Sequence, residues 1–271
     1  MRSQKELSLD GKILHAVRGL GLPGRAAQAA QFLLEDDEIQ AIQEYANTVS
    51  IKRLGYNDHG PVHMRTVALN AVGMMGLLRQ AGVKTSLESE ECGDFDDSLT
   101  AVLFAALLHD LGMAIGRQDH ELHSAYASMP IMERILARVY PESLSKQVIV
   151  RSVALEGISG HMGNRIIHSL EAGVVQIADG CDMTKGRARI SLAISGGPRV
   201  GDIHQYSANS IEEVHLSPGK EKPIRIEVLM SSEVGLFQVE EVLLGKIAAS
   251  TAKSYIELYA LVDRGKPKRY L

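Results

Sequence analysis

The stretch AVLFAALLHDLG, which begins at Ala101, constrains the fold of this chain more than any other segment. Its residues from Ala101 to Leu108 are all apolar, and an uninterrupted run of this kind is typical of a helix that is buried on all sides. The run ends directly in His109 and Asp110, whose side chains are costly to bury without partners. The sequence therefore predicts a buried helix that delivers two polar groups to a partner. Three kinds of partner remain open: a hydrogen-bonded structural pair, solvent at an exposed helix end, or a metal ion.

The chain is long and apolar enough to build a large core around this helix. It has 271 residues, 45% of them hydrophobic, which allows one large domain or two modest ones. Its formal net charge of -4 gives no electrostatic footprint for general nucleic-acid or membrane binding. The N-terminus lacks an apolar signal-peptide core, and no stretch has the roughly 18 to 20 apolar residues that span a bilayer. We therefore expect a cytoplasmic protein with neither membrane nor general nucleic-acid partners.

The two cysteines, Cys92 and Cys181, stand far apart in the sequence. This spacing argues against a disulfide scaffold and against a zinc site built from cysteines. We expect two ordinary thiols.

Helical periodicity runs through the sequence up to about residue 197. Gly60 and Pro61 have the character of a cap and a first helical residue, and His63 follows inside that helix. The acidic stretch at 87–98 predicts a surface loop, with Asp97 or Ser98 capping the AVLFAALL helix. Besides that helix, we expect two short helices over 24–54 and further helices at about 61–82, 123–139, 143–156 and 169–179.

After a glycine-rich break at 194–202, the period changes from 3.6 to two. The expected elements are strands at 211–216 and 224–230, a helix at 235–250 and a last strand at 254–262. The fold class is therefore mainly α, a helical bundle with a small C-terminal α+β (ββαβ) appendage. We divide the chain into an N-terminal helical segment at 1–39, a helical domain at 40–197 and an α+β domain at 203–271. Oligomerisation or effector sensing are hypotheses for the last of these.

Most of the 10 histidines lie in the helical part of the chain; those between residues 59 and 168 are His59, His63, His109, His120, His123, His161 and His168. A single buried histidine is usually a hydrogen-bonded core residue. As a set with Asp110, however, they favour a metal site, because imidazole nitrogen and carboxylate oxygen bind iron, manganese, zinc and related ions. Asp110 has two oxygens and could bridge two such ions.

The order of these residues resembles the HD-domain superfamily of metal-dependent phosphohydrolases, whose signature is H…HD…D on a helical bundle. The resemblance covers about residues 40–195. His63 in HMRTV matches the first ligand of the family, LLHDLG matches the doublet, and IADGCDMTKGR places the last ligand at Asp179. The resemblance implies an HD-type helical bundle and a divalent transition metal as cofactor, with Fe, Mn, Ni, Co or Zn as the candidates.

The number of ions depends on two further histidines. Members of the superfamily with two metals insert extra histidine ligands between the doublet and the last aspartate. His120 fits this pattern because a small residue and an alanine follow it four and five positions later, and His161 in SGHMGN resembles the next inserted ligand. His123 is the rival of His120, whereas we expect His168 to be structural. The resemblance thus favours a dinuclear metal centre held by His63, His109, Asp110, His120, His161 and Asp179. The alternative is a mononuclear centre held by His63, His109, Asp110 and Asp179.

Such a centre implies hydrolysis at phosphorus, because two cations can activate a bridging water and hold phosphate oxygens for in-line attack. We expect a phosphohydrolase that cleaves a phosphoester or phosphoanhydride bond of a small substrate, a nucleotide or a cyclic or linear dinucleotide. Asp110 is central to this chemistry. Lys185 and Arg187 are candidates for stabilising developing charge, and they and Arg189 are candidates for binding phosphate, since all three follow Asp179 closely.

His59 is a further candidate for contact with the phosphate, and its alternative role is that of a loop histidine near a helix start. The basic residues could equally form a solvated turn. Two other functions stay open: a dinuclear iron oxygenase, and a catalytically silent nucleotide-binding regulator on the same fold. Homo-oligomerisation is a further possibility that the sequence does not decide.

Overall fold

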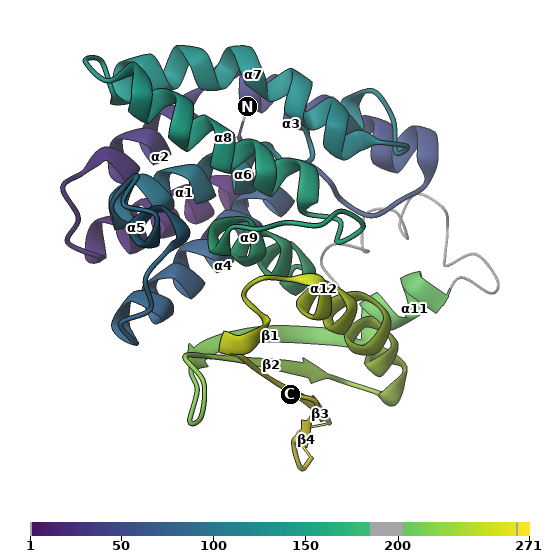
Figure 1. The fold of residues 1–271 in the computed structure, drawn as a ribbon. Helices are drawn as coiled ribbons and strands as arrows, with labels where there is room; N and C mark the ends of the chain where they lie inside the picture. The colour runs from purple at the N-terminus through teal and green to yellow at the C-terminus, as the bar shows by residue number, and fades with distance from the viewer. Residues whose placement is uncertain (1, 185–202, 264) are drawn as a thin grey trace.

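The computed structural model describes residues 2–184, 203–263 and 265–271. Lys185, Arg187 and Arg189 lie outside these residues. The first part is a helical bundle, and its helices are α1 (Gln4–Gly19), α2 (Arg25–Glu35), α3 (Asp37–Thr48), α4 (Pro61–Gln80), α5 (Ser86–Ser89), α6 (Phe95–Leu108), α7 (His120–Val139), α8 (Leu144–Gly160) and α9 (Leu170–Cys181). The rest, which we call the C-terminal unit, contains α11 (Ile203–Ser210), β1 (Ile211–Pro218), β2 (Ile224–Met230), α12 (Leu244–Ala249), β3 (Ile256–Val262) and β4 (Lys268–Arg269). The predicted fold class, a mainly α bundle with a small α+β appendage, is confirmed (Figure 1).

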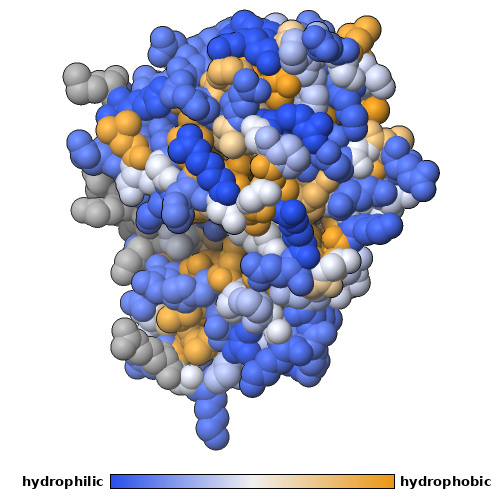
Figure 2. Space-filling model, turned by 90° about the vertical axis from the view of Figure 1, so that its left-hand side faces the viewer, coloured by the Kyte–Doolittle hydropathy of each residue, from blue (hydrophilic) through white to orange (hydrophobic). Residues whose placement is uncertain are grey.

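Helix α6 carries the AVLFAALL run and forms the centre of the bundle. Every residue from Phe95 to Leu108 is buried, and the helix packs against α2, α4, α8 and α9. Together with the short 3₁₀ turn Leu111–Ala114 it is long and apolar enough to cross a membrane, contrary to our expectation that no stretch is, but 94% of that window is buried inside the fold. On the face drawn in Figure 2, hydrophobic residues form separate patches among hydrophilic ones. Within the described residues the apolar run is thus a core helix.

The acidic stretch before α6 differs from the predicted surface loop. The helix begins at Phe95, and its cap is Asp94, not Asp97 or Ser98. Asp96 is buried because its carboxylate accepts hydrogen bonds from the backbone N–H groups of Gly24, Arg25 and Ala26 (3.2, 2.9 and 3.0 Å), which satisfies the otherwise unpaired start of α2. Charge alone predicted exposure here, whereas the side chains tie two helices together.

Asp97 is buried for a related reason. Its carboxylate accepts hydrogen bonds from the Tyr140 hydroxyl (2.9 Å) and the Lys146 ammonium (2.6 Å), and these two residues lie at the end of α7 and in α8. Within the predicted loop only residues 88–94 reach the surface, and Ser86–Ser89 forms a helical turn.

The C-terminal unit is a four-stranded sheet in the order β1-β2-β3-β4. Strand β2 pairs antiparallel with β1 and parallel with β3, so the segment between β2 and β3 crosses over the sheet. This is the predicted ββαβ arrangement with the short strand β4 added. The crossover is less regular than the single helix expected at 235–250, since it consists of a 3₁₀ turn (Glu233–Gly235), a π-helix (Gln238–Leu243) and α12.

The two parts share one core. Apolar side chains of the crossover and sheet, such as Leu243, Ile247 and Ile226, are fully buried and belong to the same hydrophobic cluster as those of α6 and α9. The π-helix and α12 contact α9, and the first two strands contact α4. In Figure 1, α12 accordingly lies between the sheet and α9. The C-terminal unit therefore packs against the bundle at helices α4 and α9.

Candidate metal centre

Six buried side chains from five helices converge at one end of the bundle. His63 lies in the first turn of α4, His109 caps α6, Asp110 follows it, His120 begins α7, His161 caps α8, and Asp179 lies near the end of α9. These are the six candidate ligands from the sequence, and each is at most 7% exposed. Because five helices begin or end here, short side chains from each can meet at one point.

Gly112 in the LLHDLG segment allows this convergence. A Cβ on Gly112 would lie 2.1 Å from the carbonyl oxygen of His120 and 2.5 Å from the backbone nitrogen of Ser124. The Gly112 N–H also donates a hydrogen bond to the Ser124 hydroxyl (2.8 Å). Because this glycine has no side chain, the turn after α6 fits against the start of α7, and His120 lies beside Asp110.

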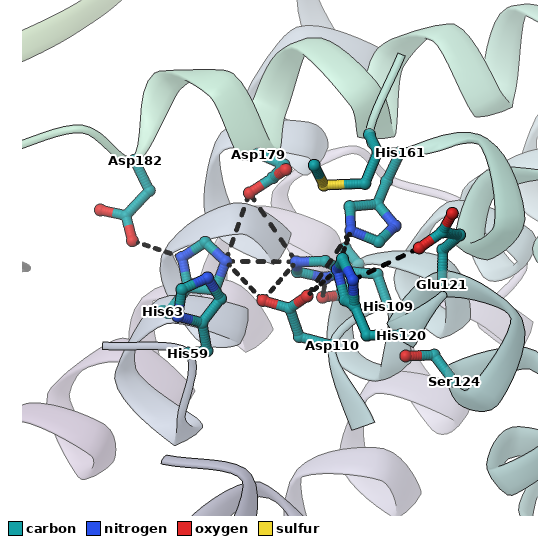
Figure 3. A network of polar contacts seen from close by, with 12 residues as sticks. His59, His63, His109, Asp110, His120, Glu121, Ser124, His161, Asp179 and Asp182 are labelled. Atoms are coloured by element: carbon teal, nitrogen blue, oxygen red, sulfur yellow. Dashed lines mark hydrogen bonds and ion pairs between the residues drawn. The ribbon is translucent and has the colours of Figure 1, made fainter. Parts of the chain in front are cut away.

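Asp110 lies in the middle of the cluster, with a pair of histidines facing each of its oxygens (Figure 3). Its Oδ2 lies 3.3 Å from His63 Nε2 and 3.5 Å from His109 Nε2. Its Oδ1 lies 3.2 Å from His120 Nε2 and 3.5 Å from His161 Nε2. The carboxylate therefore joins two separate groups of candidate ligands.

Asp179 completes the first of these groups. Its Oδ1 lies 3.3 Å from His63 Nε2 and 3.8 Å from His109 Nε2. The ligand atoms fall into three compact triads, each close enough to hold one ion: His63, His109 and Asp110; His109, His161 and Asp179; and Asp110, His120 and His161.

The hydrogen-bond partner of Nδ1 in each of the four histidine rings determines the tautomer, and therefore the state of the Nε2 atom that faces the centre. Every Nδ1 points at an oxygen acceptor: His109 at Ala106 O (2.9 Å), His161 at Ile158 O (2.7 Å), His120 at Arg117 O (3.0 Å) and His63 at Asp182 Oδ2 (2.7 Å). A carbonyl or carboxylate oxygen only accepts, so Nδ1 carries the hydrogen in the neutral ring. The Nε2 atoms then present lone pairs to the centre, the tautomer that metal-binding histidines adopt.

These lone pairs face each other directly. His63 Nε2 and His109 Nε2 are 3.2 Å apart, and so are His120 Nε2 and His161 Nε2. Two nitrogens that both lack a hydrogen cannot bond to each other, so a proton or a metal ion has to satisfy each pair. The residues present therefore fit a metal ion at each pair, with Asp110 between the two positions.

Comparison with known proteins agrees with this geometry. The sequence profile described as HD domain matches residues 62–184, which contain all six candidate ligands. The chain belongs to the HD-domain superfamily of metal-dependent phosphohydrolases. An uncharacterized protein of Methanocaldococcus jannaschii is 41% identical to it over 235 residues, covering 87% of this chain and 88% of that protein. Ribonuclease Y of Clostridium tetani is 29% identical over 130 residues, 48% of this chain, but the match spans only 22% of the ribonuclease. No solved structure matches significantly.

We call the cluster of six candidate ligands the HD centre; its members are His63, His109, Asp110, His120, His161 and Asp179. The electrostatics of the HD centre favour the protonation states that bind metal. Burial works to raise the pKa of Asp110, but the neighbouring His109 and His59 outweigh it and hold that pKa well below its usual value. Burial is likewise outweighed at Asp179, whose pKa Lys246 and His63 keep low. Burial lowers the pKa of His161 to about 4. Near neutral pH both carboxylates are thus charged and His161 is neutral, as ligands must be.

Other predicted residues lie at the edge of the HD centre or away from it. His59 lines its opening, and its ring lies 5.8 Å from that of His63. His123, the rival of His120, belongs to none of the three triads. His168 is exposed and belongs to none of the triads either. The thiol of Cys181 is buried. Burial is the main cause that raises its pKa, and the negative charges of Asp179 and Asp182 raise it further.

Three residues beside the HD centre were missed by the sequence analysis. Asp182 stands one turn after Asp179 and orients His63, and Glu121 follows His120 and lies 3.3 Å from its Nδ1. Their closeness to predicted ligands in the sequence was a usable signal. Lys246 is different, because it comes from α12 and its Nζ forms an ion pair with Asp179. No pattern in the sequence links these two residues.

A cleft of about 700 Å³ opens over the HD centre. We call the cleft wall formed by the π-helix and α12 the C-terminal wall; it presents Gln238, Glu241, Val242, Gly245 and Lys246. The lining also includes Tyr56, His59 and Arg117 from the bundle. A cleft of this size encloses a ligand as large as a nucleotide.

Proposed function

We propose that this chain is a phosphohydrolase with two divalent transition-metal ions that cleaves a phosphoester or phosphoanhydride bond of a nucleotide or a cyclic or linear dinucleotide. The observation that carries the proposal is the pair of opposed imidazole contacts, each with two unprotonated Nε2 atoms 3.2 Å apart and both bridged by one carboxylate. Membership of the HD-domain superfamily supports hydrolysis as the reaction class.

The six ligands divide between two positions that share Asp110. The first position is formed by His63, His109, Asp179 and Asp110 Oδ2, and the second by His120, His161 and Asp110 Oδ1. Ions bound there would activate a water and withdraw charge from the phosphate oxygens. The mononuclear alternative would use the first position alone.

Hydrogen bonds to neighbouring groups of the protein orient three of the histidine ligands. The backbone carbonyl groups of Ala106 and Ile158 hold the rings of His109 and His161, so the Nε2 lone pairs are aimed at the centre without reorganisation. Asp182 does the same for His63 through its carboxylate. We further propose that His59 at the edge of the cleft contacts the substrate.

The size and position of the cleft support a small phosphorylated molecule as the substrate. Ribonuclease Y, by its name, acts on RNA, and the short match to it makes an oligoribonucleotide a useful arm of a substrate panel. A nucleotide substrate also fits the cytoplasmic location that we expect.

The test is turnover of nucleoside mono-, di- and triphosphates, cyclic dinucleotides and a short oligoribonucleotide, each with Mn²⁺, Fe²⁺, Co²⁺ or Ni²⁺. We expect hydrolysis of at least one nucleotide, equal with and without dioxygen, and label from ¹⁸O-water on the phosphate product. The matched controls are Asp110→Asn, which should be inactive, and His168→Ala, which should be fully active. Activity that survives chelation and dialysis, or that consumes oxygen, would overturn the proposal.

A further inference from the structure

Lys246 connects the C-terminal unit to the HD centre. Its Nζ pairs with Asp179 Oδ2 and donates a hydrogen bond to the backbone carbonyl of His161 (2.9 Å). Its side chain is only 11% exposed. One lysine on the crossover of the sheet thus contacts the last ligand of the first metal position and the backbone of a ligand of the second.

Helix α9 has a glycine, Gly180, at the place where it contacts this lysine. A Cβ on Gly180 would lie 3.1 Å from Cδ of Lys246 and equally close to a methyl group of Leu243. Because Gly180 has no side chain, the lysine stem lies along α9, and its ammonium group reaches the neighbouring Asp179. The pairing therefore depends on the packing of two elements and is not a chance encounter of surface charges.

Lys246 leaves one oxygen of Asp179 for the centre. The lysine holds Oδ2, whereas Oδ1 faces His63 and His109 at 3.3 and 3.8 Å. The ammonium group has three hydrogens, and within the described residues two of them have partners. Since Lys246 also lines the cleft, the third is placed to meet a ligand there.

The charge of the cleft indicates what that ligand is. Its described lining holds the two permanent cations Lys246 and Arg117 against the four carboxylates of Asp110, Asp179, Asp182 and Glu241. Without metal, this lining repels an anion. With two divalent ions the balance reverses, and an anionic oxygen at the centre finds Lys246 beside one metal position and Arg117, 3.5 Å from His120 Nε2, beside the other.

We propose that Lys246 is a substrate-binding residue that holds a phosphoryl oxygen against the metal centre, so that the C-terminal unit completes the site. This inference rests on the proposed function. It assigns to the C-terminal wall the role that the sequence suggested for the basic residues after Asp179. A charge-assisted hydrogen bond of this kind contributes about a 10- to 100-fold gain in affinity.

The experiment measures binding of inorganic phosphate, by calorimetry, to the Mn²⁺-loaded full chain. The test variant is Lys246→Met, which keeps the stem packed against Gly180 and removes the charge. Lys246→Arg restores a cation, and Lys253→Ala removes an exposed lysine of the same unit that does not line the cleft. Metal content and thermal midpoint are measured for each.

We expect Lys246→Met to weaken phosphate binding about 10- to 100-fold with metal content unchanged, Lys246→Arg to recover most of the affinity, and Lys253→Ala to match the wild type. Metal-free wild type should bind no phosphate. Unchanged phosphate affinity in Lys246→Met, or a loss of affinity explained by lost metal, would overturn the role of Lys246 and leave the proposed function intact. Absence of phosphate binding in the metal-loaded wild type would instead overturn both proposals.

Discussion

The helical bundle and the C-terminal unit reach the same cleft by different means. The bundle supplies all six candidate ligands, each at or near a helix end. Backbone carbonyl groups three positions earlier in the chain orient His109, His120 and His161. His63 and Asp179 instead contact residues distant in the sequence, Asp182 and Lys246. Among the described residues, the C-terminal unit supplies none of the candidate ligands. It supplies the cation Lys246 and the C-terminal wall of the cleft. Among the described residues, the candidate metal ligands thus all come from the bundle, whereas the cleft for the substrate depends on how the two regions pack.

The largest effect is expected from loss of the residue that both metal positions share. Asp110→Ala removes both oxygens that face the four histidines, so the chain should bind no metal and hydrolysis should fall to background. The loss exceeds the roughly 100- to 1,000-fold that a single electrostatic donor is worth. Metal analysis and turnover of the best substrate check this. A variant that kept its metal would show that Asp110 is not the bridge.

Substitution of one ligand at a time tests whether the bundle holds two ions. Wild type should carry close to two transition-metal ions per chain, His120→Ala close to one, and His109→Ala close to none, because His109 takes part in two of the three triads. Elemental analysis of purified protein measures this. His123→Ala is the matched control, since His123 belongs to no triad. A stoichiometry of one in the wild type that His120→Ala does not change would support the mononuclear alternative.

A cavity in the C-terminal unit tests whether the two regions fold together. Ile247 is fully buried in the cluster that joins them, and Ile247→Ala should lower the free energy of unfolding by about 2 to 5 kcal/mol. Because the core is continuous, we expect one cooperative transition and faster amide exchange in both α9 and β2. The control Ile166→Ala changes a side chain that is 86% exposed and should have no effect. Faster exchange confined to the C-terminal unit would mean that the bundle folds without it.

The sequence predicted the bundle better than the contacts between the two regions. The run from Ala101 to Leu108 is a local signal, because a buried helix is encoded within a few residues. The candidate ligands were predictable for the same reason, with the help of the family resemblance. The burial of Asp96 and Asp97 was not, since an acidic run before a helix looks the same whether it faces water or caps a distant helix.

Lys246 shows the same limit at the site itself. It stands in the LLGKI segment of the crossover, 67 positions after Asp179, and only the packing of α12 on α9 brings the two residues together. A single sequence carries no trace of such a long-range pair. The basic residues chosen from the sequence were instead those close to Asp179 along the chain.

The pH dependence of the metal-free chain should be a smaller and more gradual effect. The pKa of His161 is about 4 in the folded chain, below its ordinary value of 6.5, because the ring is buried. Between pH 6.5 and 4 the unfolded chain therefore binds a proton that the folded chain does not, and stability falls as pH falls through this window. The loss is on the order of 3 kcal/mol.

Urea unfolding of the chelator-treated protein between pH 7 and pH 4.5 measures this loss. The variant His161→Gln removes the titrating ring and should show a flatter dependence on pH over the same range. An equally steep dependence in the variant would assign the effect to other groups. The carboxyl groups of Asp110 and Asp179, whose pKa values are also lowered, add their own loss only at lower pH.

The smallest effect is expected at the outer edge of the C-terminal unit. Arg269 in the edge strand β4 forms an ion pair with Glu221, and both side chains are exposed. Exposed pairs contribute little to stability because water and salt screen them. Arg269→Ala should therefore leave the urea midpoint, the metal content and the phosphate affinity unchanged, in contrast to Lys246→Met in the same unit. If Arg269→Ala weakened phosphate binding, the contribution of the C-terminal unit would come from its overall charge, and the contact made by α12 would no longer explain it.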